Sequence, residues 1–254
     1  MDEWRRAIAF IRALDERCAE EVIPFPWGRA LINRTLASVP DLNYLLADRP
    51  SEGVTAEALA AQADQIQGGT GVSFRRVNVD DQAAAERLLP GFAALGFTAE
   101  RFCVMARHQA PDREVDISGV QQVDWATYRP ARKREIQSWA PTALIADQAL
   151  RKQALTARVL DTTYFAALIE GAPASFCELR REGPDAQIEF VETLEPFRRR
   201  GLARQVVSAA LQAAKGASFV FLVADLFDWP RHFYERLGFE TVGIESRFMR
   251  HADG

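Results

Sequence analysis

Three consecutive arginines followed by a glycine form the part of the sequence best suited to bind an anion. The pattern is Arg198-x-x-Gly201-x-Ala203, with Arg199 and Arg200 inside it. Glycine lets the backbone approach a bulky phosphate, a small alanine keeps the next turn open, and the guanidinium groups supply positive charge for a pyrophosphate or a 3′-phosphate. A charged run of this kind is also commonly a solvated surface, so its sequence context has to decide between the two interpretations.

The arginine segment lies between an expected strand and an expected helix. Residues 186–193 have the composition of a strand, and residues 201–215 carry apolar side chains on one helical face before Gly216. The first N–H groups of a helix have no partner within the helix, and the helix dipole adds partial positive charge at that end. An anion site is therefore expected at the turn from strand to helix. An apolar strand over 219–224 and a short helix over 229–237 follow.

The arginine segment and a second motif further along the chain together resemble the GNAT superfamily of acyl-CoA-dependent N-acyltransferases. The second motif runs from Phe233 to Phe239 and contains Tyr234 and Gly238. In this superfamily a (Q/R)-x-x-G-x-(G/A) loop cradles the pyrophosphate of acetyl-CoA, and the preceding strand pairs with the pantetheine arm. The resemblance covers roughly residues 120–250 and implies a mixed central sheet flanked by helices.

Carried over by position, the resemblance implies a binding site for acetyl-CoA. Backbone groups at the end of the strand would contact the pantetheine, at Val191, Glu192 and Thr193. The loop and the first helical turn would hold the phosphates, through Arg198, Arg199, Arg200, Gly201, Leu202, Ala203 and Arg204. Tyr234 matches the general acid that protonates the coenzyme A thiolate, a task that suits a phenol with an ordinary pKa near 10. Asp228 stands where an asparagine commonly contacts the pantetheine, and it fits equally well as a helix N-cap.

The implied reaction is direct attack of a neutral amine on the thioester, so a general base must first take the ammonium proton. Glu189 and Glu192 on the strand beside the cofactor are the candidates, acting directly or through water. Alternation along a strand places them on opposite faces of the sheet, and the sequence leaves open which face meets the substrate. His232, next to Tyr234, is expected on a different helical face.

The composition describes a globular chain. Of its 254 residues 48% are hydrophobic and 26% are charged, which is enough apolar material for a sizeable core. A formal charge of −4 argues against a polybasic nucleic-acid-binding protein, and no stretch approaches the roughly 18 apolar residues that span a bilayer. Cys18, Cys103 and Cys177 follow no disulfide or metal-ligand pattern and have no activating neighbours. We therefore expect a cytoplasmic protein without a metal site, a membrane anchor or a nucleic-acid partner.

The N-terminal part shows a faint internal similarity to the C-terminal part. Residues 95–97 and 237–239 are both Leu-Gly-Phe, each before an expected strand, so that Gly96 aligns with Gly238. This similarity predicts a degenerate, partial GNAT-like domain over 1–112 and a catalytic domain over 113–254. Coincidence is the alternative, because Gly-Phe pairs are common.

In that alignment the candidate acid and the residues expected to bind phosphate have no counterparts of the same type. The aligned pairs are Tyr234 with Phe92, Arg198 with Ala56, and Gly201 with Leu59. Phenylalanine has no hydroxyl, and neither alanine nor leucine binds a phosphate. The N-terminal copy is therefore expected to be inert toward the cofactor.

The expected protein has an α/β (α+β) fold, with a GNAT-like mixed central sheet flanked by helices and preceded by a partial GNAT-like domain. The expected function is transfer of the acetyl group of acetyl-CoA to a primary amine of a small molecule or a protein. The alternative is a non-catalytic acyl-CoA-binding or sensory module on the same fold. A homodimer is compatible with either function.

Overall fold

The structure, a computed structural model, describes residues 2–48, 50–227 and 230–251. Contacts within the chain divide it into two compact units. Described residues of the first unit fall within 1–104, 224–228 and 242–254, and those of the second within 105–223 and 229–241. The predicted domain boundary at residues 112–113 stays a prediction, because it concerns continuous segments of sequence and the packing units are not continuous.

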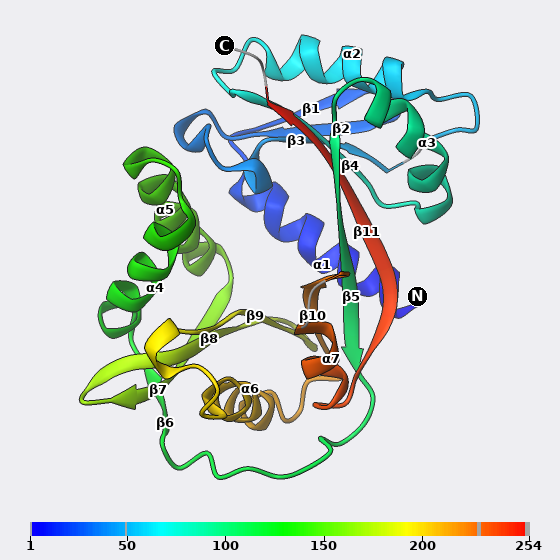
Figure 1. Cartoon of the computed structure of the whole chain (residues 1–254). Helices are drawn as coiled ribbons and strands as arrows, with labels where there is room; N and C mark the ends of the chain where they lie inside the picture. The colour runs from blue at the N-terminus through cyan, green and yellow to red at the C-terminus, as the bar shows by residue number, and fades with distance from the viewer. Residues whose placement is uncertain (1, 49, 228–229, 252–254) are drawn as a thin grey trace. The chain divides into compact units, whose positions relative to one another are not determined.

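The first unit is a mixed sheet with three helices (Figure 1). The helices are α1 (Glu3–Cys18), α2 (Ala56–Gln67) and α3 (Gln82–Ala94). The strands, in their order across the sheet, are β1 (Glu21–Phe25), β2 (Gly28–Ile32), β3 (Tyr44–Ala47), β4 (Phe74–Val79), β11 (Phe239–His251) and β5 (Thr98–Arg107). β3 and β4 run parallel, and β4 and β11 run antiparallel. The division between the units falls inside three strands, β5, β11 and β10 (Phe219–Asp225).

Side-chain caps explain where the helices of the first unit begin. The capping side chains and the N–H groups that donate to them are Asp2 with Arg5 at 2.7 Å, Thr55 with Ala58 at 3.3 Å, and Asp81 with Ala84 at 2.7 Å. Each cap satisfies an N–H group that the helix itself leaves unpaired. Residues 55–67 and 82–94 are also rich in helix-forming side chains, and the two helices accordingly begin at Ala56 and Gln82.

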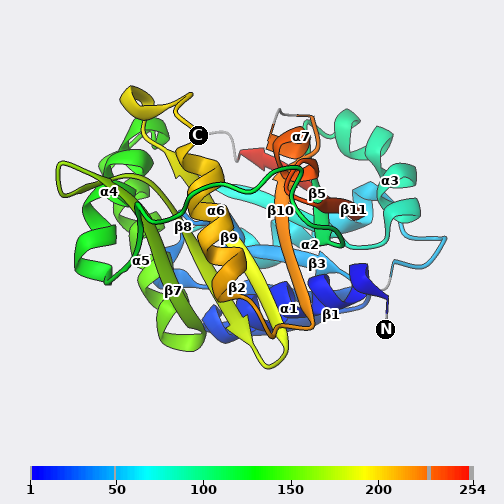
Figure 2. The same ribbon diagram turned by 90° about the horizontal axis from the view of Figure 1, so that it is seen from below.

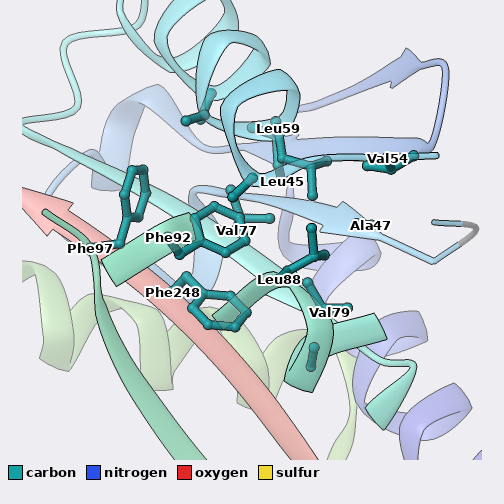
Figure 3. Packing of buried hydrophobic residues seen from close by; sticks show 14 of the residues in the cluster. Leu45, Ala47, Val54, Leu59, Val77, Val79, Leu88, Phe92, Phe97 and Phe248 are labelled. Carbon is teal, nitrogen blue, oxygen red and sulfur yellow. The ribbon is translucent and has the colours of Figure 1, made fainter. Parts of the chain in front are cut away.

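The core of the first unit is built around Phe92 (Figure 3). Its ring is fully buried and lies 4.3 Å from the ring of Phe248 and 5.1 Å from that of Phe97, measured between centroids. Aliphatic side chains of α2, β3 and β4 complete the cluster, among them Leu59, Leu45 and Val77. The position that the sequence pairs with Tyr234 is therefore part of a hydrophobic core.

The first unit also contains a buried ionic network. Glu245 of β11 is 0% exposed and accepts hydrogen bonds from Arg12 Nη2 at 2.6 Å and from Arg247 Nη2 at 2.7 Å. Arg12 also donates to Asp80 at 2.6 Å. Burial alone would raise the pKa of Glu245, but Arg247 and Arg12 hold it at about 2. The carboxylate is thus ionised in the folded protein and joins α1 to the sheet.

The second unit is a mixed sheet with helices on both faces (Figures 1 and 2). The helices are α4 (Trp125–Trp139), α5 (Ala143–Val159), α6 (Leu202–Ala213) and α7 (Pro230–Glu235). The strands, in their order across the sheet, are β10 (Phe219–Asp225), β9 (Asp185–Thr193), β8 (Ala172–Glu182), β7 (Asp161–Ile169) and β6 (Val120–Val123). β10 and β9 run parallel, and the other neighbours run antiparallel.

Adjacent residues of β8 show which helices cover which face. The ring of Phe176 lies 5.2 Å from that of Tyr128 in α4, whereas Cys177 Sγ lies 3.5 Å from the carbonyl oxygen of Val206 in α6. Successive strand residues point to opposite faces. α4 and α5, which pack on each other, therefore cover one face, and α6 lies across β7, β8 and β9 on the other (Figure 2).

Both units repeat the same order of elements. Three antiparallel strands lead through a helix to a strand parallel to the third, and a second helix follows: β1-β2-β3-α2-β4-α3 in the first unit, β7-β8-β9-α6-β10-α7 in the second. The mixed α/β fold with sheet and flanking helices is confirmed. The internal similarity that the sequence suggested is thus present in the fold.

The residue pairing deduced by aligning Gly96 with Gly238 is wrong at the start of α6. α2 begins at Ala56 and α6 at Leu202. The helix starts therefore pair Gly201 with Thr55, rather than with Leu59, and Arg198 with Glu52, rather than with Ala56. The two alignments differ because the chain runs 40 residues from Ala56 to Gly96 but only 36 from Leu202 to Gly238.

Two predicted segments differ from the structure. The sequence over 120–128 predicts a single strand, but the strand ends at Val123, because Asp124 caps α4 by accepting from Thr127 N at 2.8 Å. The sequence does not predict β1, because Pro24 lies inside it, yet an edge strand tolerates proline since one of its sides needs no N–H donors. Among the described residues no helix has the length and apolarity to cross a membrane, and no group of acidic, histidine or cysteine side chains is arranged to bind a metal.

Candidate active site

The loop between β9 and α6 leads into a helix start that no side chain caps. Gly201 is the N-cap of α6, with φ +79°, whereas Asp124 and Thr142 cap α4 and α5 with their side chains. A Cβ on Gly201 would meet no atom within 4 Å. The positive φ requires glycine, and the space beside it is open at the positive end of the helix dipole. These are the features of an anion site.

Three of the four predicted arginines are exposed at this helix start. Arg198, Arg199 and Arg200 are all exposed, and Arg199 has a left-handed φ of +62°. Arg198 Nε donates to the carbonyl of Thr193 at 3.1 Å, and the Arg200 guanidinium lies 5.5 Å from the ring centroid of Phe197. A non-glycine residue at positive φ is uncommon and recurs at functional loops. The three exposed guanidinium groups thus immediately precede the uncapped start of α6 in the sequence.

The fourth arginine is engaged elsewhere. Arg204 is 5% exposed, and its Nη1 lies 2.5 Å from Asp112 Oδ1. The hydrogen bond from Arg204 lowers the pKa of Asp112. The Arg204 guanidinium is therefore paired with a carboxylate of the segment that follows β5, and it does not lie on the exposed surface of the loop.

Proline, glycine and charged residues over 108–119 predict a linker, and the first residues of this segment pack against the motif from Phe233 to Phe239. His108 N and Gln109 N donate to the carbonyl of Gly238 at 2.9 and 3.1 Å, and Asp112 N donates to that of Arg236 at 2.9 Å. A Cβ on Gly238, which has φ +88°, would lie 2.1 Å from the carbonyl oxygen of Gln109. The glycine of the motif is thus required for a close crossing of two backbone segments.

A β-bulge in β9 changes the expected facing of the two candidate bases. Opposite β8, Glu178 pairs with Glu189 and Phe176 with Glu192, so a two-residue step in β8 faces a three-residue step in β9. Directly opposed residues share a face, and so do residues two apart in β8. Glu189 and Glu192 therefore lie on the same face, beneath α4 and α5. The prediction of opposite faces is wrong because Phe190, at φ +50°, lies in a bulge that adds a residue.

β9 extends beyond its pairing with β10. The parallel register runs from Asp185–Phe219 to Ile188–Leu222, whereas β9 continues to Thr193. The residues predicted to contact pantetheine lie in this extension, and they are Val191, Glu192 and Thr193. A strand edge past its paired part can accept an extended ligand through main-chain hydrogen bonds.

The ionisable groups at the bulge influence one another. Tyr234 is 8% exposed, and burial, reinforced by the negative charges of Glu189 and Glu192, raises the pKa of its phenol. Burial also raises the pKa of Glu192, against the opposing effect of Arg132 and Arg198. The phenol is thus protonated at neutral pH, and the charges of both predicted bases act on it in the same direction.

A buried polar cluster beside the bulge was missed from the sequence. Glu178 is 2% exposed and accepts from Tyr128 Oη at 3.0 Å, Gln153 Nε2 at 2.8 Å and Arg180 Nη2 at 2.8 Å. Arg132 Nε donates to Gln153 Oε1 at 3.0 Å. The available signal was the pair Glu178 and Arg180, two apart in a strand and separated by an apolar leucine, which indicates a polar stripe on one face.

The other residues considered from the sequence are His232, Cys177 and Asp228. His232 is exposed, with Nδ1 2.9 Å from Glu235 Oε2, while Tyr234 on the same short helix is buried, as expected for different helical faces. Burial raises the pKa of the Cys177 thiol, which disfavours the nucleophilic thiolate. Asp228, predicted as a pantetheine contact or N-cap, lies outside the described residues.

Comparison with known protein families finds one family that is similar to the second unit. Residues 123–239 match the acetyltransferase (GNAT) family, so this part of the chain is similar to a GNAT acetyltransferase domain. The matched segment contains the β9 bulge, the loop over 194–201 between β9 and α6, which we call the arginine loop, and Tyr234. No curated protein sequence matches the chain.

Solved structures share the fold over nearly the whole chain. A GCN5-related N-acetyltransferase from Kribbella flavida superposes with a TM-score of 0.64 at 17% identity, covering 99% of this chain and 96% of that one. A conserved protein of unknown function from Staphylococcus epidermidis gives a TM-score of 0.68 at 14% identity, with 91% and 94% covered. A tandem GNAT protein from the clavulanic acid biosynthesis pathway gives 0.52 at 15% identity, with 78% and 70% covered. The two-unit GNAT-like architecture thus occurs in other proteins.

Proposed function

We propose that this protein is an N-acetyltransferase that transfers the acetyl group of acetyl-CoA to a primary amine of a small molecule or a protein. The observation that carries the proposal is the uncapped start of α6 at Gly201, next to three exposed arginines in a GNAT-like domain. Unpaired helix N–H groups and guanidinium groups together suit a pyrophosphate. A cytoplasmic location, a possible homodimer and the absence of nucleic-acid and membrane partners stay predictions.

The described residues fit acetyl-CoA, which would supply an activated acetyl thioester when bound. First-turn N–H groups of α6, with Arg199 and Arg200, would hold the phosphates, and Arg198 closes the loop back onto Thr193. The open space beside Gly201 accommodates a phosphate where any side chain would intrude. Arg204 would support the loop through Asp112 rather than touch the ligand.

The groups at the bulge suit the proton transfers of the proposed reaction. Glu192, whose pKa burial raises, takes the proton from the acceptor ammonium, and Glu189 on the same face can share this role directly or through water. A base whose pKa lies nearer the operating pH is more effective in both accepting and releasing a proton. Tyr234 keeps its phenolic proton at neutral pH and can donate it from Oη to the departing sulfur.

Calorimetric titration with acetyl-CoA tests the cofactor site. The parent protein is expected to bind, and Gly201→Glu is expected to abolish binding by filling the phosphate position with a carboxylate. Gly171→Glu is the matched control, because Gly171 also has φ +79° and open surroundings but lies in the turn between β7 and β8. Failure of the parent to bind acetyl-CoA would refute the proposal.

Turnover against a panel of primary amines, followed by release of coenzyme A, distinguishes the enzyme from a sensor. Acetylated amine with stoichiometric thiol release supports the acetyltransferase. Binding without turnover across small-molecule and peptide amines would instead support the non-catalytic acyl-CoA-binding module.

A further inference from the structure

Phe190 occupies a backbone conformation that a bulky residue avoids. Its φ is +50°, and the other non-glycine residues at positive φ among those described are Glu170 in a turn and Arg199 in the arginine loop. For L-residues this region is disfavoured by contact between Cβ and the backbone. Such a conformation persists only where surrounding structure holds it in place. Something outside the backbone of β9 must therefore stabilise the bulge.

Two arginine side chains contact the ring of Phe190. The guanidinium carbon of Arg132, from α4, lies 4.1 Å from the ring centroid, and that of Arg180, from β8, lies 5.1 Å away. Both arginines are buried, at 5% and 4% exposure. Attraction between a cation and an aromatic face is stronger when the cation has lost its water. The ring thus has two desolvated cations as neighbours from two different elements.

Each of these arginines is itself fixed by hydrogen bonds. Arg180 donates from Nε and Nη2 to Glu178 Oε2 at 3.1 and 2.8 Å. Arg132 donates from Nε to Gln153 Oε1 at 3.0 Å and from Nη1 to Glu135. The planes of both guanidinium groups are therefore set by partners on α4, α5 and β8, independently of Phe190.

We propose that Arg132 and Arg180 are positioning residues that hold the β9 bulge through the ring of Phe190, and that this bulge keeps Glu189 and Glu192 on one face of the sheet. Without the extra residue, alternation would turn Glu192 toward α6 and separate it from Glu189. The consequence for catalysis rests on the proposed function, whereas the claim about the strand register does not. The two parts therefore need separate measurements.

The register is tested by crystal structures of full-length Phe190→Leu and Phe190→Tyr. Leucine keeps an apolar side chain but has no aromatic face, and tyrosine restores the ring. We expect Phe190→Leu to lose the pairing of Glu178 with Glu189 and Phe176 with Glu192, and Phe190→Tyr to keep it. An unchanged register in Phe190→Leu would overturn the proposal. This result is informative even if the protein binds no acetyl-CoA.

The arginine contribution is tested with Arg132→Lys, which keeps a positive charge but loses the planar guanidinium. We expect kcat to fall about 100-fold from misplacement of the carboxylates, while KM for acetyl-CoA stays within about twofold. Arg134→Lys, an exposed arginine on the same helix, is the matched control and should retain the parental kcat. Should Arg132→Lys fold poorly by circular dichroism, Phe190→Leu gives the same comparison with α4 intact. Equal kcat in Arg132→Lys and Arg134→Lys would overturn the role of Arg132.

Discussion

Arg204 and Asp112 form an ion pair, 2.5 Å from Nη1 to Oδ1, that joins the first turn of α6 to the segment after β5. The same segment donates backbone hydrogen bonds to Gly238 and Arg236. The arginine loop and the motif around Tyr234, which are separate in sequence, are thus connected through a third segment. Arg204 therefore has a structural partner in Asp112, whereas Arg198, Arg199 and Arg200 are exposed.

This ion pair predicts different consequences for two arginine substitutions. Arg204→Met removes a buried guanidinium from its partner and is expected to lower the melting temperature while leaving the acetyl-CoA Kd within about twofold. Arg200→Met should leave the melting temperature unchanged and weaken acetyl-CoA binding about tenfold, the loss of one charge-assisted contact. Calorimetry and thermal unfolding of both variants make the comparison. A large loss of acetyl-CoA affinity in Arg204→Met would instead support a direct contact between Arg204 and the phosphates.

Removal of the Tyr234 hydroxyl is expected to slow the chemical step. Tyr234→Phe keeps the ring and should lower kcat about 100-fold, because general acid catalysis is lost, with little change in acetyl-CoA affinity. Tyr164→Phe is the matched control, since Tyr164 on β7 has a similarly small exposed fraction. Steady-state kinetics with the best amine acceptor provides the measurement. Equal losses in the two variants would remove Tyr234 from the role of acid.

The acid limb of the pH–rate profile is expected to depend on Arg132. As the proposed base, Glu192 must be unprotonated to accept a proton, so activity is expected to fall as pH drops through its pKa. Burial raises this pKa, and Arg132 opposes the increase. Arg132→Gln should therefore move the acid limb of kcat/KM upward by about one pH unit. Arg134→Gln removes an exposed charge from the same helix, and an identical shift in that control would contradict the assignment.

Glu245 is expected to control the stability of the first unit. Glu245→Gln leaves Arg12 and Arg247 without a buried counter-charge and should lower the free energy of unfolding by about 3 kcal/mol, measured by urea titration. Glu52→Gln, at an exposed position, should have no comparable effect.

The same carboxylate predicts the sign of an acid effect. Its folded pKa of about 2 lies below the ordinary value of 4.5, so the stabilisation is present above about pH 4.5 and is lost as pH falls toward 2. Urea titrations of the parent between these limits should show this decrease, and Glu245→Gln should show less of it. Parallel pH dependence in both proteins would assign acid sensitivity to other groups.

Local signals predicted most elements of the fold. Apolar spacing and capping residues indicated α2, α3 and α6 close to their observed starts. Asp124 was not recognised as a helix cap, because valine before it and tryptophan and tyrosine after it are all typical of strands, and only the hydrogen bond from Thr127 N marks the start of α4. Capping is decided by a single side chain, which composition over a window does not resolve.

The sequence by itself determined the arginine loop, the glycine at the helix start and the candidate acid, because a positive φ, a guanidinium and a phenol are properties of individual residues. Only the tertiary structure decided how Glu189 and Glu192 face, because a bulge is a register relationship between two strands. The bulged residue is Phe190 rather than a glycine, so the local sequence does not predict the bulge. Its ring is stabilised by Arg132 of α4 and Arg180 of β8, which precede it in sequence and reach Phe190 only in the folded chain.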